Sequence, residues 1–556
     1  MARQTGRPRT TRRPRNAGRP EAGRPEAGRQ ADDGSRRASG TSPRAGGASG
    51  RARVGPARAE TDQARRTAYD VLSAVTSRGA YANLLLAASL RERGLSGPDA
   101  ALATELVYGT LRGLGSYDAI IGLCSDRGLD RIDAPVREVL RLGVHQLLGM
   151  RMKPHAAVAT SVDLAAEVAG RRPAGFVNAV LRRVTAHDLA AWIAIVAPDR
   201  AADPIGYLSI RYSHPRWIVE AIAEALGEVV TPARAVAPAA TVAAAQVGGP
   251  AKDGPAGDRL AGDGLAGDGL AGDGLAQTEA ALAADADRPV VTLAAVPGLC
   301  LPDELMAAGA ITARWSPFGA YLPHGDPGQV AAVGERRAGV QDEASQLAAL
   351  AVTRAPAASD LAWLDLCAGP GGKARLLAGL AAARGAVLVA ADAHEHRARL
   401  AAEATSCISA ARAVTADGTV PPWRAAAFDR VLADVPCSGL GSLRRRPEAR
   451  WRRGPGEIAD LAALQRRLLT AAVESARPGG IVAYVTCSPH VAETRDVVGD
   501  VVGRRGDVEV LDAPGLLAEV PDLRCPEPFG KYAQFWPHRH GTDAIFLTVL
   551  RRTSAA

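Results

Sequence analysis

A chain of 556 residues is too long for one hydrophobic core and predicts three or four domains. Its seven cysteines are odd in number, widely spaced and without a paired metal-ligand spacing, which favours a reducing compartment and argues against a disulfide framework or a metal site. The N-terminus lacks the apolar core of a secretory signal, and no apolar stretch is long enough to cross a bilayer. We therefore expect a cytoplasmic protein, with neither a membrane nor a metal as partner.

Residues 1–60 hold 15 arginines against five acidic residues, so they account for the whole formal charge of +8. Arg, Pro, Gly, Ala and Ser dominate this segment, and such a composition buries too little apolar surface to offset chain entropy. We predict a disordered basic arm. It either searches for RNA through counterion release or is a solvated tail without a specific role, and the sequence leaves both interpretations open.

Residues 62–184 have dense helical periodicity, with apolar side chains every three or four positions, and predict an all-helical domain. The motifs ATELVYGTLR from Ala103, VREVLRLGVHQLL from Val136 and GFVNAVLRR from Gly175 resemble the NusB-type RNA-binding fold. The resemblance implies that helix arginines meet RNA phosphate; the alternative is that several of them are ordinary solvated helix charges. The candidates are Arg112, Arg137, Arg141, Arg182 and Arg183.

Residues 185–338 predict a small mixed α+β domain. LSIRYSHPRWIVEAIAEAL indicates a turn and an amphipathic helix, and RPVVTLAAV is typical of a strand. Repeats of LAGDG interrupt the segment over residues 250–276 and predict a disordered surface loop. A calcium-binding repeat is disfavoured, because the period is five rather than nine.

Residues 339–552 alternate apolar strands with helices: LAWLDL, AVLVAAD, FDRVLADV, GIVAYVTCS and DAIFLTVL are the strand candidates. This alternation predicts an α/β domain with a Rossmann-like, doubly wound sheet. The first strand leads through Gly369, Pro370, Gly371 and Gly372 into a helix near Lys373, and glycines there let the backbone approach a ligand.

The glycine turn is neither a phosphate loop nor the spaced G-x-G-x-x-G of dinucleotide binding, so a ligand without a pyrophosphate is favoured. Asp392 ends the second strand, where a carboxylate can accept both ribose hydroxyl hydrogens. Asp417 follows the next strand, within reach of an adenine amino group, and Asp434 ends the fourth. Each alone is more often a turn or cap residue, but together they predict S-adenosylmethionine as the cofactor.

Two cysteines follow neighbouring strands, Cys437 in DVPCSGLGSLRRRPEARW and Cys487 in YVTCSPHVAE, and we expect them to face one cleft. Carbon 5 of cytosine is a poor nucleophile and must be activated by covalent addition at carbon 6, which suits a cysteine thiolate. Asp434 is the candidate acid at ring nitrogen 3. Cys437 is the candidate that assists release after methyl transfer. Each cysteine taken alone is more often a small buried hydrophobe.

CAGPGGK, ADVPCSGLGSLRRRPE and VTCS, in this order, resemble the RNA cytosine-5 methyltransferases, and GVQDEASQLAA from Gly339 resembles the helix that opens their catalytic domain. Together with the NusB-like segment, residues 62–552 are similar to the bacterial 16S rRNA enzymes of the Sun (RsmB) type. The resemblance implies that Cys487 attacks the base and that Cys437 promotes product release. It implies cofactor contacts from Cys367, Ala368, Gly369, Pro370, Gly371, Gly372, Lys373, Asp392, Asp417 and Asp434.

Two positions depart from the family pattern: Ala374 stands where Thr is frequent, and ETR from Glu493 stands where ENE is common. A DNA cytosine methyltransferase would attack with Cys437 instead, and the TCS motif and NusB-like segment disfavour it. A transfer RNA cytosine-5 methyltransferase and a noncatalytic NusB-like RNA-binding or antitermination factor remain as alternatives. We expect a monomer that binds 16S rRNA. The basic cluster is expected near the RNA backbone or is a solvated charge run: Arg444, Arg445, Arg446, Arg450, Arg452 and Arg453.

Overall fold

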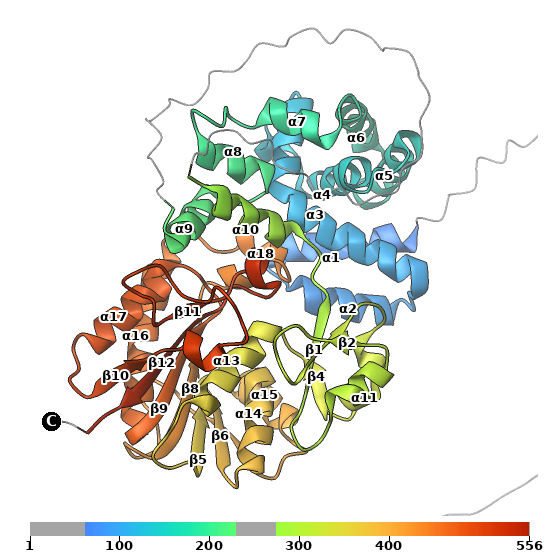
Figure 1. Ribbon diagram of the computed structural model, residues 1–556. Helices are drawn as coiled ribbons and strands as arrows, with labels where there is room; N and C mark the ends of the chain where they lie inside the picture. The colour runs from blue at the N-terminus through green and yellow to red at the C-terminus, as the bar shows by residue number, and fades with distance from the viewer. Residues whose placement is uncertain (1–61, 229–273, 555–556) are drawn as a thin grey trace, which may run out of the picture. The chain divides into compact units, whose positions relative to one another are not determined.

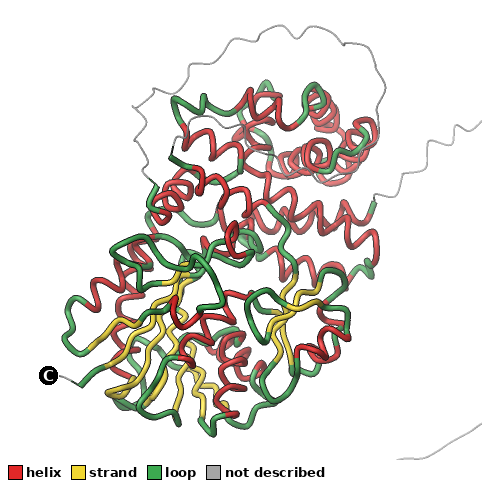
Figure 2. The backbone as a smooth tube through the Cα atoms, in the orientation of Figure 1, coloured by secondary structure: helices red, strands yellow, loops and turns green. Residues whose placement is uncertain are grey.

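The computed structural model describes residues 62–228 and 274–554. The predicted basic arm, residues 1–60, lies outside the described residues, as does nearly all of the predicted loop over residues 250–276. Figure 2 shows a region built of helices and two separate groups of strands. In the described residues, none of the helices combines the length and apolar character that a membrane crossing requires.

The first six helices form an all-helical unit around one apolar core. The carboxylate of Asp62 caps the first helix by accepting hydrogen bonds from the N–H groups of Ala64 and Arg65, and Gly79 ends that helix in the left-handed region with φ 66°. This confirms the all-α fold expected for the segment. The helices are α1 (Gln63–Arg78), α2 (Ala82–Glu92), α3 (Gly97–Cys124), α4 (Ala134–Val144), α5 (Pro154–Val168) and α6 (Arg171–Val184).

Four further helices follow: α7 (Leu189–Val196), α8 (Pro204–Arg211), α9 (Arg216–Leu226) and α10 (Ala276–Ala286). Leu208 and Ile218 lie in the segment predicted to form a small separate domain. They share an apolar core with Leu440 and Trp536 of residues 339–552. Residues 185–226 therefore pack partly against the C-terminal part of the protein.

A four-stranded sheet comes next, with strand order β2-β3-β1-β4 and antiparallel pairing throughout. Strand β1 lies within the predicted strand segment RPVVTLAAV. Leu293 and Ala320 lie opposite each other in its core. The elements are β1 (Val291–Ala295), α11 (Pro302–Ala307), β2 (Ile311–Thr312), β3 (Gly319–Leu322), α12 (Ala331–Gly334) and β4 (Ala338–Val340).

The second sheet has eight strands, in the order β10-β12-β9-β8-β5-β6-β7, with β11 paired to β12. Strands β9, β8, β5, β6 and β7 are parallel, whereas β12 runs antiparallel to β9. The Rossmann-like prediction is confirmed, with this mixed edge added. The strands are β5 (Ala362–Asp365), β6 (Val387–Asp392), β7 (Ala411–Thr415), β8 (Phe428–Asp434), β9 (Ala476–Thr486), β10 (Val508–Leu511), β11 (Ala533–Gln534) and β12 (Phe546–Arg552).

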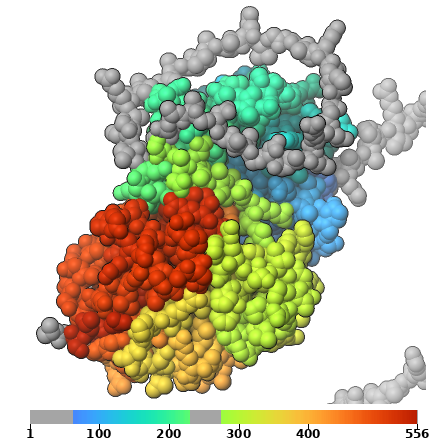
Figure 3. Space-filling view, in the orientation of Figure 1, coloured from blue at the N-terminus to red at the C-terminus, as the bar shows by residue number. Residues whose placement is uncertain are grey.

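Helices cover both faces of this sheet (Figure 1). One face packs on α13 (Glu343–Arg354), α14 (Gly372–Ala383) and α15 (Glu395–Ala404), and the other on α16 (Glu457–Ser475) and α17 (Arg495–Val502). The short α18 (Pro537–His540) precedes β12. In the space-filling view the C-terminal strands and helices, in red and orange, join the yellow segment with β5 and β6 in one continuous surface (Figure 3). In open α/β sheets, ligands bind at the carboxyl ends of the parallel strands, so a ligand site is expected at that edge.

Candidate active site

A cavity of about 690 Å³ opens at this carboxyl edge. Asp392 at the end of β6, Asp434 at the end of β8, and both Cys437 and Cys487 line it. Tyr81, from the start of α2, lines the same cavity. The volume lies within the range of small-molecule and cofactor sites. The parallel strands thus bring together carboxylates and thiols that are up to about a hundred residues apart in sequence.

The glycine turn after β5 is required by close packing. Gly371 has φ 106°, and a Cβ there would lie 2.6 Å from the Cβ of Ala404 and 3.0 Å from the Cα of Ala401. A Cβ on Gly369 would lie 2.7 Å from an Asp392 carboxylate oxygen. Contacts this short leave no room for a side chain, so α14 can approach α15 only with glycine at these positions.

The turn also fixes the ribose-site candidate. The N–H of Gly369 donates to Oδ2 of Asp392 at 3.1 Å, and the N–H of His394 donates to Oδ1 at 3.0 Å. Each carboxylate oxygen retains a further lone pair for a ligand hydroxyl. Arg397, which also lines the cavity, places its Nε 3.5 Å from Asp392 Oδ2.

Asp417 reaches the cavity from the loop after β7. The N–H and the hydroxyl of Thr419 both donate to its Oδ1, at 2.8 Å each. These hydrogen bonds, the backbone one first, lower the pKa of Asp417 below its usual value. The carboxylate therefore stays charged at neutral pH and can accept a hydrogen bond from an amino group, as the adenine prediction requires.

Six of the ten residues predicted to bind the cofactor line the cavity, and four do not. Those that line it are Cys367, Gly369, Pro370, Asp392, Asp417 and Asp434. Ala368, Gly371, Gly372 and Lys373 do not line it, and Gly371 instead makes the helix contact described above. The size of the cavity, the bare backbone of the turn and the two acceptor carboxylates fit an adenosine-containing sulfonium cofactor.

Lys373 places a positive charge beside Asp434. Its Nζ donates to Oδ2 of Asp434 at 2.8 Å, and its side chain is 11% exposed. Burial alone would lower the pKa of Lys373, but the attraction of Asp434 outweighs burial and the pKa is raised. Asp365, at the end of β5, was not predicted to belong to the site. Burial, reinforced by the nearby charge of Asp434, raises the pKa of Asp365 to about 8.

The two thiols meet because β8 and β9 are neighbouring parallel strands, with Asp434 opposite Val485. The Sγ atoms of Cys437 and Cys487 are 3.0 Å apart. The hydrogen bond from the Cys437 thiol lowers the pKa of Cys487. Burial and the negative charge of Asp434 oppose this effect, and the positive charges of Lys373 and Arg446 support it. The same hydrogen bond raises the pKa of Cys437 well above its usual value. Cys487 is therefore the more acidic thiol of the pair.

Glu493 ties the two cysteine loops together, and the sequence pattern noted its segment only as a departure from ENE. Its carboxylate is fully buried. Oε1 accepts hydrogen bonds from the Ser438 N–H at 2.8 Å and the Gln465 side chain at 3.0 Å, and Oε2 accepts from the hydroxyls of Ser438 and Ser488. Because Ser438 follows Cys437 and Ser488 follows Cys487, one carboxylate sets the spacing of both thiols.

The basic cluster after Cys437 divides into two groups. Arg446, Arg452 and Arg453 line the cavity. Arg445 instead pairs with the buried Asp543. Arg450 is fully buried. Its guanidinium donates to the main-chain carbonyls of Arg112, Ser213 and Asp285. The prediction of a phosphate contact is wrong for Arg450, because no surface of its side chain is exposed.

One arginine of the helical unit is likewise structural. Arg141 is 7% exposed, and its guanidinium bridges Asp118 and Glu138. Two charge partners in a buried setting leave it unavailable to phosphate, so that prediction is wrong too. Arg183 is exposed and pairs with Asp126. An exposed pair of this kind is weak and can open to a ligand.

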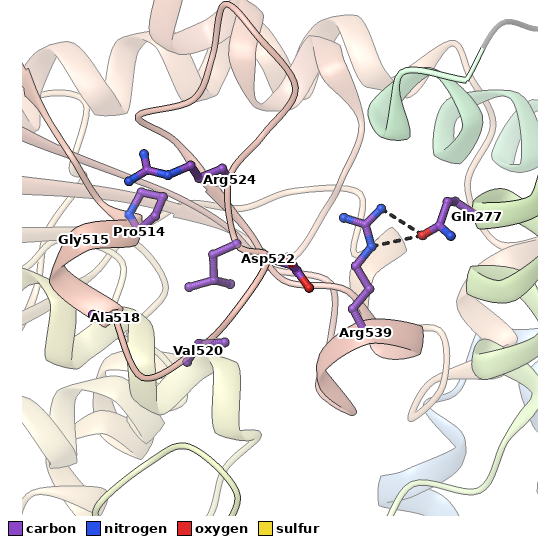
Figure 4. A pocket seen from close by; sticks show the side chains of 9 residues that line it. Gln277, Pro514, Gly515, Ala518, Val520, Asp522, Arg524 and Arg539 are labelled. Carbon is purple, nitrogen blue, oxygen red and sulfur yellow. Dashed lines mark hydrogen bonds between the residues drawn. The ribbon is translucent and has the colours of Figure 1, made fainter.

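A second cavity, of about 830 Å³, lies apart from all predicted site residues (Figure 4). Arg524 and Asp522 line it on one side, and Arg539 reaches across to the side-chain oxygen of Gln277 (Figure 4). Arg524 is already paired with Asp512. In the described part of the chain no group of three or more His, Cys, Asp or Glu residues is arranged to hold a metal ion.

Known proteins resemble the chain along most of its length. A Mycobacterium tuberculosis protein named for methyltransferase activity alone is 45% identical over 493 residues, which are 88% of this chain and 97% of that protein. A Xylella fastidiosa protein named ribosomal RNA small subunit methyltransferase B is 31% identical, over 81% of this chain and 90% of that protein. The model of the 16S rRNA methyltransferase RsmB/F family matches residues 351–551, and that of the NusB family matches residues 62–186.

The chain belongs to the RsmB/F family of 16S rRNA methyltransferases. It is an S-adenosylmethionine-dependent RNA methyltransferase with a NusB-type domain. The crystal structure of PH0851 shares the fold, with a TM-score of 0.65 and 18% identity over 89% of this chain and 99% of that chain.

Proposed function

We propose that this RsmB/F-family protein methylates carbon 5 of a cytosine in 16S rRNA, and that Cys487 is the nucleophile that adds to carbon 6 of the base. One observation carries the proposal: two thiols with sulfur atoms 3.0 Å apart line the same cavity as Asp392, Asp417 and Asp434. A base inserted into this cavity meets a sulfur nucleophile beside the cofactor site. The target base must leave its stack to enter.

The nucleophile is assigned from the difference between the two thiols. The lowered pKa of Cys487 increases the fraction present as thiolate, which is the reactive form. The thiolate forms a bond to carbon 6 of the cytosine ring, and the electron pair of the C5–C6 double bond moves into the ring. When bound, S-adenosylmethionine supplies the methyl group that the activated carbon 5 receives.

Asp434 is the proposed acid at ring nitrogen 3. The Lys373 ammonium contacts the Asp434 carboxyl at 2.8 Å and places a positive charge beside the ring as it gains electron density. Asp434, a carboxylate beside Lys373 in the free enzyme, passes a proton from water to nitrogen 3 as sulfur adds, and this proton returns to water when the adduct breaks down. No net proton is gained or lost at Asp434 in one cycle.

Cys437 assists the last step. After methyl transfer the carbon 5 proton leaves to water, its electron pair restores the C5–C6 double bond, and the Cys487 sulfur departs as a thiolate. The Cys437 thiol, whose raised pKa keeps it protonated, donates its hydrogen bond to that departing sulfur. Loss of this donor slows elimination and leaves the RNA bound to Cys487.

Two variants test the chemistry on the full-length protein. Cys487→Ala is expected to abolish tritium transfer from labelled S-adenosylmethionine to RNA, with cofactor affinity unchanged. Cys437→Ala is expected to accumulate a covalent protein–RNA complex that survives denaturing electrophoresis. Cys407→Ala is the matched control, because Cys407 is exposed and lies outside the cavity. Methylation by Cys487→Ala would overturn the assignment.

The 16S substrate is supported by the names of the relatives and by the NusB-type domain. Bisulfite sequencing of RNA from cells with and without the protein tests it. Methylation at carbon 5 protects a cytosine from deamination by bisulfite. We expect one such protected cytosine in 16S rRNA to become deaminated when the protein is absent. A change confined to transfer RNA would favour a transfer RNA enzyme, and no change in either RNA would favour the noncatalytic RNA-binding factor.

A further inference from the structure

The catalytic cavity has a wall that comes from the helical unit. Gly79 and Tyr81, in the turn between α1 and α2, line the cavity together with Cys437 and Cys487. Tyr81 is 52% exposed. The ring therefore keeps free surface beside a cavity large enough for a nucleotide, and a flat aromatic surface of this kind can stack on a base.

The turn is fastened to the catalytic part of the protein. The N–H of Ala82 donates to the buried carboxylate of Glu448 at 3.4 Å, and the Arg452 guanidinium donates to the carbonyl of Ala80. Glu448 belongs to the short helix η5 (Pro447–Trp451), and Arg452 follows it. These contacts hold the position of Tyr81 relative to the cysteine loops, although more than 360 residues separate Ala82 from Glu448 in sequence.

Arg452 also covers one face of the ring. Its guanidinium carbon lies 4.5 Å from the centroid of Tyr81. A cation stacked on one face fixes the plane of the ring and leaves the other face for a second flat group. Arg446 and Arg453 line the same cavity and supply positive charge beside the ring. A flat partner that carries negative charge matches this arrangement.

We propose that Tyr81 is a positioning residue for RNA: a nucleotide next to the methylated one stacks on its free face while the target base enters the cavity. The NusB-type domain then supplies part of the RNA subsite beside the reaction centre. Single-stranded RNA is recognised mainly by stacking of unpaired bases on aromatic and arginine side chains, with cations along the backbone. This proposal rests on the RNA methyltransferase function but not on which ring atom is methylated.

Leu84 provides a matched comparison. It lies in the first turn of α2, three residues after Tyr81, is 67% exposed, and does not line the cavity. Leu84→Ala therefore shows the effect of removing an exposed apolar side chain from α2, and Tyr81→Leu shows the effect of removing the ring from the cavity. Tyr81→Phe and Tyr81→Trp keep a flat ring, whereas Tyr81→Leu keeps apolar bulk without a stacking face.

The test uses the full-length protein and a 16S rRNA transcript. Affinity for the transcript is measured by filter binding in the presence of S-adenosylhomocysteine, the product that the cofactor leaves. The initial rate is measured by tritium transfer to the transcript. Tyr81→Leu is expected to weaken RNA affinity and raise KM for RNA about ten-fold, with kcat and cofactor affinity within about two-fold. Tyr81→Phe, Tyr81→Trp and Leu84→Ala are expected to match the unaltered protein.

Equal RNA affinity for Tyr81→Leu and the unaltered protein would overturn the proposal. So would a Tyr81→Phe protein as weak as Tyr81→Leu, because the hydroxyl rather than the ring would then matter. A lowered kcat with a lowered melting temperature and unchanged KM would assign Tyr81 a structural role instead. Filter binding needs no turnover, and tritium transfer does not depend on the methylated atom. Failure of the cytosine-5 chemistry is therefore distinguishable from failure of the stacking proposal.

Discussion

Replacing Glu493 by Gln tests whether one buried carboxylate sets the geometry of both thiols. Its two oxygens accept four hydrogen bonds, from Gln465, Ser488 and two groups of Ser438. Glutamine keeps one acceptor oxygen and turns the other into a donor that faces two hydroxyls. Hydrogen bonds to a charged group contribute about 1.5–3 kcal/mol each, and neutral ones about 1 kcal/mol. The hydroxyls can rotate to accept, so we expect a net loss of about 2–4 kcal/mol.

The catalytic effect follows from the position of the sulfur atoms. Displacement of a reacting group by about 1 Å can cost on the order of 100-fold in rate. We expect Glu493→Gln to lower kcat about 10- to 100-fold, with cofactor affinity unchanged, and to lower the midpoint of urea unfolding. Glu509→Gln is the control, because Glu509 forms an exposed pair with Arg551 and its loss should cost under about 1 kcal/mol. A Glu493→Gln protein with unaltered stability and rate would refute the reasoning.

Three further predictions follow from the site. Gly371→Ala should reduce both the stability and the cofactor affinity of the protein, because the added methyl group meets α15. Gly385→Ala, which has open space around it, should lower the free energy of unfolding by only about 1 kcal/mol. Thermal unfolding and calorimetric titration with the cofactor compare the two variants. The single-turnover rate should fall as pH decreases through the lowered pKa of Cys487, with a midpoint below the usual value near 9, and a midpoint at or above 9 would contradict the nucleophile assignment. Diamide, a thiol oxidant, should inactivate the enzyme by joining Cys437 to Cys487, with recovery in dithiothreitol; a mass spectrum without this disulfide would contradict the 3.0 Å spacing.

The sequence determined the features that depend on residues close together in the chain. Alternation of apolar strands and helices predicted β5, β6, β8, β9 and β12, and the family motifs predicted the RsmB/F-type architecture. The glycine turn was readable because it joins a strand directly to a helix. Short β10 was missed, since its four residues VEVL, with no fully buried side chain, give little apolar signal.

Only the tertiary structure decided which side chains meet across long stretches of sequence. Arg450 and its neighbours look alike as a charge run, yet Arg450 is buried against three carbonyls while Arg446 lines the cavity. Tyr81 reaches the cavity because Glu448 and Arg452 hold its turn. Periodicity records which face of an element is apolar but not which distant element packs on it. Packing between such elements therefore decides what is buried, what is paired and what remains free to bind RNA.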